Sequence, residues 1–157
     1  MRIGLGYDVH RLAPDIPLVI GGINIPHSQG LIGWSDADVL THAVMDALLG
    51  AAALGDIGMH FPPNDPQYKD VSSLLLLGKV RHLLEKSGYK VGNVDVTVVA
   101  EQPKLAPHFD DMRTALAMAL SCEPSDIGIQ ATTSEKLGFV GREEGIAAWA
   151  IAAIEKI

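Results

Sequence analysis

The sequence predicts a single domain that combines α-helices with β-strands, and several observations support this prediction. The chain has 157 residues, a length that corresponds to one domain with one substantial core. Apolar residues alternate with other residues over 2–10 and 93–101, the period of two that is typical of strands. They recur every three or four positions over 38–54 and 71–87, which indicates helices.

The first 25 residues predict a strand and then a hairpin. The alternation over 2–10 indicates a half-buried strand whose polar face carries both Asp8 and His10. A hairpin follows at residues 18–25, where the Gly21-Gly22 pair supplies the positive φ that a tight turn needs.

Two helices follow, with a long loop between them. The helix at 38–54 is predicted to be amphipathic, with the Ser35-Asp36 pair as capping candidates. The helix at 71–87 has Asp70 as a plausible N-cap. The segment 56–68 contains three prolines and has no regular period. We expect a loop of about thirteen residues there, long enough to suggest a function.

The last third of the chain predicts a helix and a short strand, and one segment is ambiguous. Pro107 can open a helix that ends near Ser121, and residues 127–132 form a short strand. Residues 146–154 favour a helix by their alanine content and a strand by their length and flanks.

Composition and charge exclude several classes of protein. Lys and Arg total 12 and Asp and Glu total 19, so the formal net charge is −7, the wrong sign for a nucleic-acid partner. Apolar residues make up 48% of the chain and charged residues only 20%, which excludes a disordered chain. The apolar runs at 47–54 and 145–154 are shorter than the roughly 18 residues of a membrane span. No membrane partner is expected.

The single cysteine and the first residues indicate the location. Cys122 cannot form an intrachain disulfide, which fits a reducing compartment. Residues 1–4 lead directly into alternating sequence, without the features of a secretory signal. We expect a cytoplasmic bacterial protein, or a plastid protein if a transit segment was removed.

The first candidate site combines Asp8 and His10 with His42. Side chains at i and i+2 project from one face of a strand, so Asp8 and His10 can hold a cation together, and a helical histidine can complete the set. Two nitrogens and one oxygen leave a fourth position open, the ligand count of a catalytic zinc site. For an isolated Asp-x-His pair, the commoner alternative is a hydrogen-bonded pair at the end of a strand.

A second candidate is the acidic start of the first helix. At helical spacing Asp38, His42 and Asp46 fall on one face, where a carboxylate can orient a metal-bound imidazole. The alternative is a capped helix start with solvated acidic side chains.

Glycine-rich or turn-rich loops form a third candidate. The segments 55–58, 103–107 and 132–136 offer backbone amides, hydroxyls and lysines that suit a phosphate or a nucleotide. None matches the P-loop or dinucleotide fingerprints, so generic turns are the alternative. Arg142, in the segment 138–145, can grip an anion with two hydrogen bonds.

The remaining histidines and two other residues suggest no site. His27, His60, His82 and His108 lack a partner at ligand spacing and are expected on the surface or in loops. Trp149 and Cys122 are expected in the core.

These weak signals occur together and in a fixed order along the whole chain. The strings that carry this order are Gly6-Tyr7-Asp8-Val9-His10, Ser35-Asp36-Ala37-Asp38-Val39, His42-Ala43, residues 50–58, Pro103-Lys104-Leu105 and Glu135-Lys136-Leu137-Gly138-Phe139. In this combination they resemble the 2-C-methyl-D-erythritol 2,4-cyclodiphosphate synthase family of the non-mevalonate isoprenoid pathway.

The resemblance implies an α+β fold in one domain over residues 1–157, with a four-stranded mixed sheet and helices packed on one side. It assigns residues 146–154 to a strand. It also implies a homotrimer with active sites between neighbouring subunits. The implied enzyme is a phosphorus-oxygen lyase that cyclises 4-diphosphocytidyl-2-C-methyl-D-erythritol 2-phosphate to the 2,4-cyclodiphosphate and releases CMP.

The resemblance implies roles for individual residues as well. Asp8, His10 and His42 would bind one zinc ion per subunit, and Glu135 would bind Mg2+ or Mn2+ on the substrate diphosphate. Thr133 would support the transition state. The substrate-binding residues would be Asp8, His10, Ser35, Asp56, Ile57, Gly58, Phe61, Asp65, Ala100, Lys104, Leu105, Ala106, Thr132, Glu135, Phe139 and Arg142.

Within that set, residues 56–58 would contact the erythritol part of the substrate. Residues 100–106, with Thr132 and Thr133, would line a cytidine diphosphate pocket from the adjoining subunit. Phe139 and Arg142 resemble positions at a central cavity that can hold an isoprenoid diphosphate in relatives.

The sequence departs from the family pattern at three positions. Position 34, a catalytic position that is usually His, is Trp34, which can donate one hydrogen bond and cannot carry a positive charge. Position 63 is usually acidic and is Pro63 here. Position 143 is usually Gly and is Glu143 here, so the conformation of that turn is an open question.

Two other functions stay open beside the cyclase. A zinc phosphohydrolase that uses metal-bound hydroxide would employ the same ligands and would give a linear phosphate. An isoprenoid-diphosphate-binding trimer that lost turnover through Trp34 would release no CMP.

Overall fold

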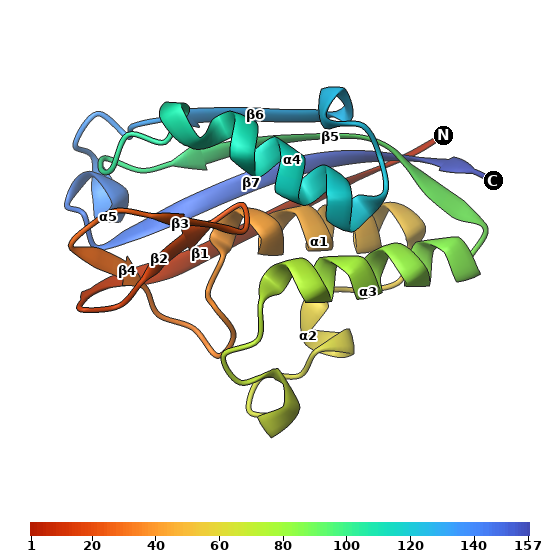
Figure 1. Ribbon diagram of the computed structural model, residues 1–157, viewed down its shortest axis with the longest axis horizontal. Coiled ribbons are helices and arrows are strands. Elements are labelled where there is room, and N and C mark those ends of the chain that lie inside the picture. The colour runs from red at the N-terminus through yellow and green to blue at the C-terminus, as the bar shows by residue number, and fades with distance from the viewer.

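A mixed sheet of five strands forms the centre of the computed structural model, which describes residues 1–157 (Figure 1). The strand order is β4-β1-β7-β5-β6, and only β5 and β6 are parallel neighbours. The strands are β1 (Arg2–Pro14), β4 (Gln29–Leu31), β5 (Tyr89–Val99), β6 (Ile127–Thr132) and β7 (Gly145–Lys156).

The expected mixed sheet is confirmed, but the expected number of four strands is wrong. The additional strand, β4, has three residues and pairs with Leu12–Pro14 at the end of β1. A segment this short shows no alternation that could predict it. The strand assignment of residues 146–154 is confirmed, since they lie within β7.

A separate hairpin contains β2 (Leu18–Ile20) and β3 (Ile23–Ile25), as predicted. Its turn uses Gly21 and Gly22 at φ 60° and 76°, values that glycine adopts without a steric penalty.

Helices cover one face of the sheet, which confirms that prediction (Figure 1). The helix α1 lies on β1 and β7, α3 packs between α1 and α4, and α4 reaches β6. The helices are α1 (Val39–Ala52), α2 (Ile57–His60), α3 (Ser73–Lys86), α4 (Phe109–Leu120) and α5 (Gly138–Gly141). None of them combines the length and the apolar character that crossing a membrane requires.

The helix starts differ from the predicted ones. The N-cap of α1 is Asp38, whose carboxylate accepts a hydrogen bond from the N–H of Thr41, and not the Ser35-Asp36 pair. The N-cap of α3 is Ser72, while Asp70 has a left-handed φ of 57°. Ser, Asp and Asn all favour a cap, so a run of such residues does not select one of them.

The predicted loop at 56–68 contains short helical turns. Asp56 caps α2 by accepting a hydrogen bond from Met59 N–H at 3.0 Å. Asp65 caps a 3-10 turn at Pro66–Tyr68 in the same way. These turns are too short to produce a helical period in the sequence.

The strand β1 has the predicted alternation, but with the opposite burial. Gly4 and Gly6 face α1 and are buried, whereas Leu5 is 67% exposed and Ile3 is 65% exposed. A Cβ atom on Gly6 would lie 2.0 Å from the carbonyl oxygen of Ala43. The helix therefore sits against the backbone of β1, which is the close approach that glycine permits.

The uncovered face of the sheet carries large apolar side chains, which we call the open face. It consists of Ile3, Leu5, Tyr7 and Val9 on β1 and of Trp149 and Ile151 on β7. Tyr7 and Trp149 are cross-strand partners whose ring centroids lie 4.9 Å apart. Trp149 is thus not a core residue, contrary to prediction, and Cys122 is only partly buried.

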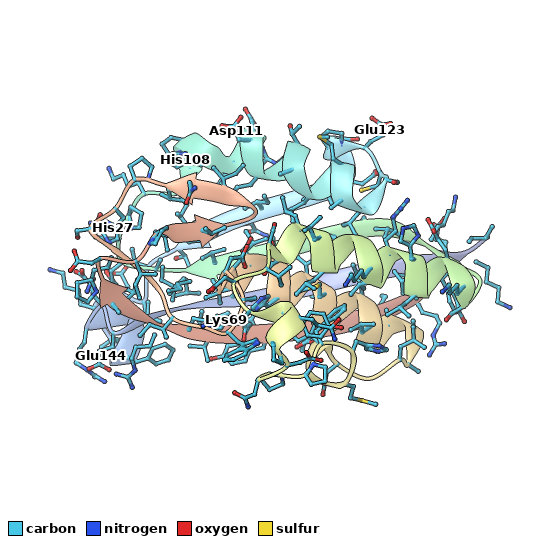
Figure 2. All side chains as sticks on the ribbon, turned by 60° about the horizontal axis from the view of Figure 1, so that its bottom comes forward. His27, Lys69, His108, Asp111, Glu123 and Glu144 are labelled. Atoms are coloured by element: carbon cyan, nitrogen blue, oxygen red, sulfur yellow. The ribbon has the colours of Figure 1, made fainter.

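The four histidines without predicted partners behave as expected. None is buried; His82 is exposed on α3 and His60 ends α2. Figure 2 shows His27 and His108 at the periphery of the molecule.

Candidate functional site

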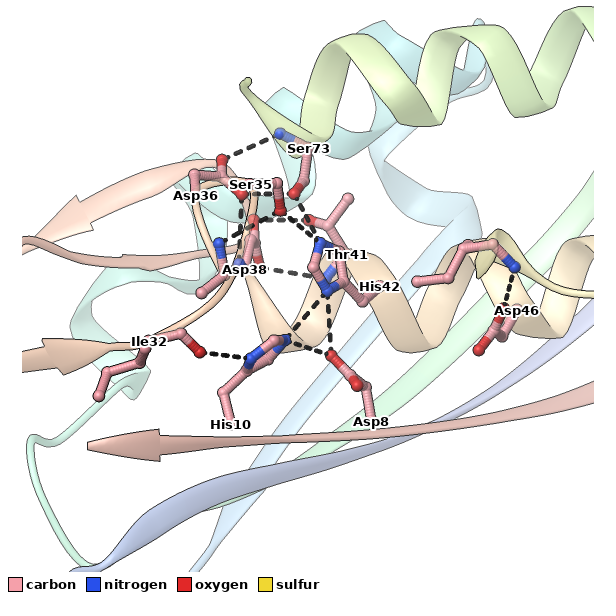
Figure 3. Close-up of polar contacts among 12 residues, drawn as sticks. Asp8, His10, Ile32, Ser35, Asp36, Asp38, Thr41, His42, Asp46 and Ser73 are labelled. Atoms are coloured by element: carbon pink, nitrogen blue, oxygen red, sulfur yellow. Dashed lines mark hydrogen bonds and ion pairs between the residues drawn. The ribbon is translucent and has the colours of Figure 1, made fainter. Parts of the chain in front are cut away.

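Asp8, His10 and His42 meet at the junction of β1 and α1 (Figure 3). The Nε2 atom of His10 lies 2.9 Å from Oδ2 of Asp8, and Nδ1 of His42 lies 3.1 Å from the same oxygen. The two ring nitrogens are 3.1 Å apart. The three atoms therefore form a nearly equilateral triangle.

The close contact between β1 and α1 explains why these residues meet. Asp8 and His10 continue the side of β1 that carries Gly4 and Gly6, because side chains two residues apart share a face. That side faces α1, which brings His42 down onto the strand. The glycines thus set the distance between Asp8 and His10 on the strand and His42 on the helix.

Each histidine ring has one nitrogen that faces away from Asp8, and the contacts of that nitrogen determine where the ring carries its proton and its lone pair. Nδ1 of His10 lies 2.8 Å from the carbonyl oxygen of Ile32, and a carbonyl can only accept, so this nitrogen donates. Nε2 of His42 lies 2.9 Å from the hydroxyl of Ser73 and 3.1 Å from that of Ser35. The neutral tautomers that fit these contacts turn a lone pair on each ring toward Asp8.

Three electron-pair donors that face one another fit a cation. A tetrahedral zinc ion about 2.0–2.1 Å from its ligands needs ligand separations of roughly 3.3 Å, close to the 2.9 to 3.1 Å found here. Both imidazoles also have the outer hydrogen bond that orients a metal-bound histidine. The chemistry of the donors therefore fits a divalent metal.

The charges of the cluster reinforce one another. Burial opposes ionisation of Asp8, but the close contacts with His10 and His42 outweigh it and lower the pKa of Asp8 to about 2. Burial disfavours the charged form of His10, yet the contact with Asp8 prevails and raises the pKa of His10. Asp8 is an anion over the physiological range.

The predicted carboxylate partners of His42 hydrogen-bond elsewhere. Asp38 accepts hydrogen bonds from Gly21 and Gly22 N–H and from Thr41, and burial raises the pKa of Asp38. Asp46 accepts from Ile57 N–H at 2.8 Å, and burial raises its pKa too. The prediction that one of them orients the imidazole directly is wrong, because the ring nitrogens of His42 contact Ser35, Ser73, Asp8 and His10 instead.

A pocket of about 250 Å³ opens beside the cluster. Residues on its wall that the sequence singled out are Asp8, His10, Trp34, Ser35, His42, Ile57, Gly58, Phe61 and Pro63. Asp56 and Asp65 are not on that wall; their carboxylates cap the adjacent turns. The structure therefore brings the strand, the helix start and the segment 57–63 together around the cluster.

A second pocket, of about 340 Å³, lies between the loop after β5 and the end of β6. The predicted nucleotide residues on its wall are Ala100, Lys104, Leu105, Ala106, Thr132 and Thr133. Glu101 also lines it, and its carboxylate accepts hydrogen bonds from Ser134 and Lys136 N–H at 3.0 and 3.2 Å. Glu135 follows Thr133 in the same loop but lines neither pocket.

The comparisons with known proteins identify the family. Residues 1–155 match the YgbB family. The chain is 63% identical over 156 residues, 99% of both chains, to a 2-C-methyl-D-erythritol 2,4-cyclodiphosphate synthase from Dehalococcoides mccartyi strain CBDB1. The chain belongs to this synthase family.

Solved structures of the family have the same fold. The bifunctional IspDF of Campylobacter jejuni matches with a TM-score of 0.96 and 38% identity, over 99% of this chain and 42% of that longer chain. A 2C-methyl-D-erythritol-2,4-cyclodiphosphate synthase in its CDP-bound form matches with a TM-score of 0.90 and 34% identity. The match covers 98% of this chain and 100% of that chain.

The departures from the family pattern have defined places in the structure. The indole Nε1 of Trp34 donates to the carbonyl oxygen of Asp65 at 2.9 Å, so its one donor is already used. Glu143 has a φ of 57°. The turn thus keeps a left-handed conformation that glycine would adopt more easily.

Phe139 and Arg142 lie on or next to α5, at one end of the sheet. Phe139 lines a shallow hollow with Val9 and Glu144. Nε of Arg142 donates to Glu144 at 2.9 Å, and this pairing lowers the pKa of Glu144. Arg142 is therefore already paired with a carboxylate.

Sequence reasoning missed Ser73 as a residue of the site. It is fully buried and lies 2.9 Å from His42, although 31 positions separate the two along the chain. No local pattern marks such a contact, because it depends on how α3 packs against α1.

Proposed function

We propose that this chain converts 4-diphosphocytidyl-2-C-methyl-D-erythritol 2-phosphate to 2-C-methyl-D-erythritol 2,4-cyclodiphosphate and releases CMP in isoprenoid precursor biosynthesis. The observation that carries the proposal is the convergence of Asp8, His10 and His42 in a chain that is 63% identical to a synthase of this activity.

Asp8, His10 and His42 would hold one zinc ion, and Glu135 would contact a second ion, Mg2+ or Mn2+, on the substrate diphosphate. The bound ions would supply positive charge that polarises a phosphate and stabilises the leaving CMP. The nucleophile is a substrate phosphate oxygen that is already ionised at neutral pH, so the chain needs no general base.

The protein then has to bring two anionic groups together and orient them. The walls formed by Ile57, Gly58 and Phe61 would hold the erythritol part against Ser35 and the metal-binding residues. Lys104 and the backbone of residues 100–106 would hold the cytidine diphosphate, and the hydroxyl of Thr133 would donate to charge that develops on the transferred phosphate.

The open face supports a homotrimer with shared active sites. Six large apolar side chains that are 41–67% exposed lie together on β1 and β7, and such a contiguous patch marks an interaction surface. Assembly through this face would place the nucleotide pocket of one subunit beside the metal cluster of its neighbour.

Leu5→Glu is expected to give a monomer without turnover, because a charge in the open face opposes assembly and each site would lack its neighbour's half. Light scattering beside an activity assay measures both properties. Leu75→Glu is the control, since Leu75 is 64% exposed on α3, away from the open face. Full specific activity in a demonstrated monomer would refute the shared site.

Trp34→His is expected to raise kcat/KM about tenfold. A histidine can give the phosphate a charge-assisted hydrogen bond worth roughly 1.5–3 kcal/mol, and roughly 1.4 kcal/mol is one decade of rate. The indole cannot substitute, because its N–H is held by Asp65. Steady-state kinetics at saturating metal measure the change. An unchanged or lower kcat/KM would mean that Trp34 packs over the site and that another group makes the hydrogen bond to the phosphate.

One incubation separates the cyclase from its alternatives. Phosphorus NMR of the reaction with the cytidylyl substrate should show a cyclic diphosphate together with CMP. A linear phosphate would indicate a phosphohydrolase, and unchanged substrate would indicate a binding protein for isoprenoid diphosphates.

The turn at 142–144 carries one positive and two negative side chains. It therefore favours an isoprenoid diphosphate less than Arg142 alone would.

A further inference from the structure

The acidic start of α1 contains Asp36, a residue without a role in the proposed reaction. Its Oδ2 accepts the backbone N–H of Ser73 at 2.9 Å, and its Oδ1 accepts the hydroxyl of Ser73 in a short contact. Asp36 thereby fixes the first residue of α3 through two hydrogen bonds (Figure 3).

These contacts define the direction of the next hydrogen bond. Ser73 is fully buried, and its only hydroxyl proton is donated to Asp36. At 2.9 Å from Nε2 of His42, the Ser73 oxygen can then only accept. His42 must carry a proton on Nε2, so in the neutral ring the lone pair is on Nδ1, the nitrogen that faces Asp8 and His10.

No other neighbour of His42 imposes this tautomer. Ser35 also reaches Nε2, at 3.1 Å, but no carboxylate accepts its hydroxyl proton, so it can donate or accept. Asp38 and Asp46 receive their hydrogen bonds from other groups, as described above. Asp36 is the carboxylate that reaches His42 through a single hydroxyl.

We propose that Asp36 and Ser73 are positioning residues that lock the ring and tautomer of His42 for metal binding. The unit joins three parts of the fold: the segment before α1, α1 itself and the start of α3. The proposal rests on the proposed function in one respect only, namely that the cluster binds zinc.

Ser73→Ala removes the acceptor and should weaken zinc binding by roughly 10–100-fold, the usual effect of losing a partner of a metal-bound histidine. Zinc affinity is measured by competition with a chelator. Nitrogen NMR of the metal-free protein reports the protonation of each ring nitrogen. The fraction of His42 with a proton on Nε2 should fall, because the Asp8 carboxylate then favours a proton on Nδ1. Ser72→Ala is the matched control, because the Ser72 side chain makes no capping hydrogen bond.

Asp36→Asn tests the same unit without loss of volume, and it serves if Ser73→Ala does not fold. Its amide can donate to Ser73, which frees the Ser73 proton to reverse the bond to His42. Ser73→Thr keeps a hydroxyl and should restore the tautomer and most of the zinc affinity.

The outcomes separate the two proposals. Wild-type zinc affinity and tautomer in both Ser73→Ala and Asp36→Asn would overturn the positioning role, even if the wild type is an active cyclase. The other case is a wild type that binds zinc without turnover. If the tautomer still changes in the variants, the positioning role is supported and the proposed function is refuted.

Discussion

His42→Ala is expected to lose most of its bound zinc and to reduce kcat/KM by more than the roughly 10–100-fold that the loss of an outer partner costs. Only Asp8 and His10 would remain as ligands, and two ligands do not hold zinc in a catalytic site. Elemental analysis of the purified protein gives the zinc content, and steady-state kinetics give the rate.

His82→Ala is the control for this experiment, because His82 is exposed on α3 and makes contacts only with Arg81 and Glu85. Its zinc content and rate should equal those of the wild type. Unchanged far-UV circular dichroism of both variants would show that the fold persists. Full zinc occupancy in His42→Ala would rule out the assigned cluster.

Gly6→Ala is expected to destabilise the fold by about 1–3 kcal/mol or more, the cost of overpacking a tight contact. The added Cβ would meet the carbonyl oxygen of Ala43 at 2.0 Å and the backbone N of Ala47 at 2.6 Å. Backbone atoms cannot move aside as a flexible side chain can, so α1 must shift away from β1. Urea unfolding at equal subunit concentration measures the loss.

The shift should also separate His42 from Asp8 and His10, so zinc affinity should fall together with stability. Gly50→Ala provides the comparison, because its Cβ meets only an oxygen of Leu5 at 3.9 Å and alanine favours a helix by up to about 1 kcal/mol. Equal stability of Gly6→Ala and the wild type would contradict the backbone contact described here.

The sequence predicted the positions of the helices and strands better than which side of each is buried. The alternation in β1 correctly placed Asp8 and His10 on one side, but a period of two does not say which side faces the core. The glycine side is buried because α1 needs the space that side chains would fill. The apolar side chains of β1 therefore lie on the open face.

The helix α1 shows a related limit of pattern analysis. It was predicted as amphipathic, yet only Asp46 and Gly50 within it are not buried. The sheet covers one side of α1 and α3 covers another, so nearly every position is apolar or small. Periodicity weakens when a helix is enclosed on most sides.

The cluster of Asp8, His10 and His42 was predictable because Asp8 and His10 are two residues apart on one strand. The residues around it were not, since Ser73 and the wall at 57–63 reach the site only through tertiary packing. The hydrogen bond from the Trp34 indole to the carbonyl oxygen of Asp65 likewise joins residues 31 positions apart.

The position of β7 has a consequence for how the chain folds. This strand lies between β1 and β5, and its residues pair with the first strand from Arg2↔Ile154 to Arg11↔Gly145. The central pairing of the sheet therefore links segments about as far apart in sequence as the chain allows, a topology of high contact order that folds slowly. During synthesis, β1 and α1 emerge long before β7, and the apolar surface that β7 covers stays exposed until then. The sheet that carries Asp8 and His10 is therefore completed only after residues 145–156 have been synthesised.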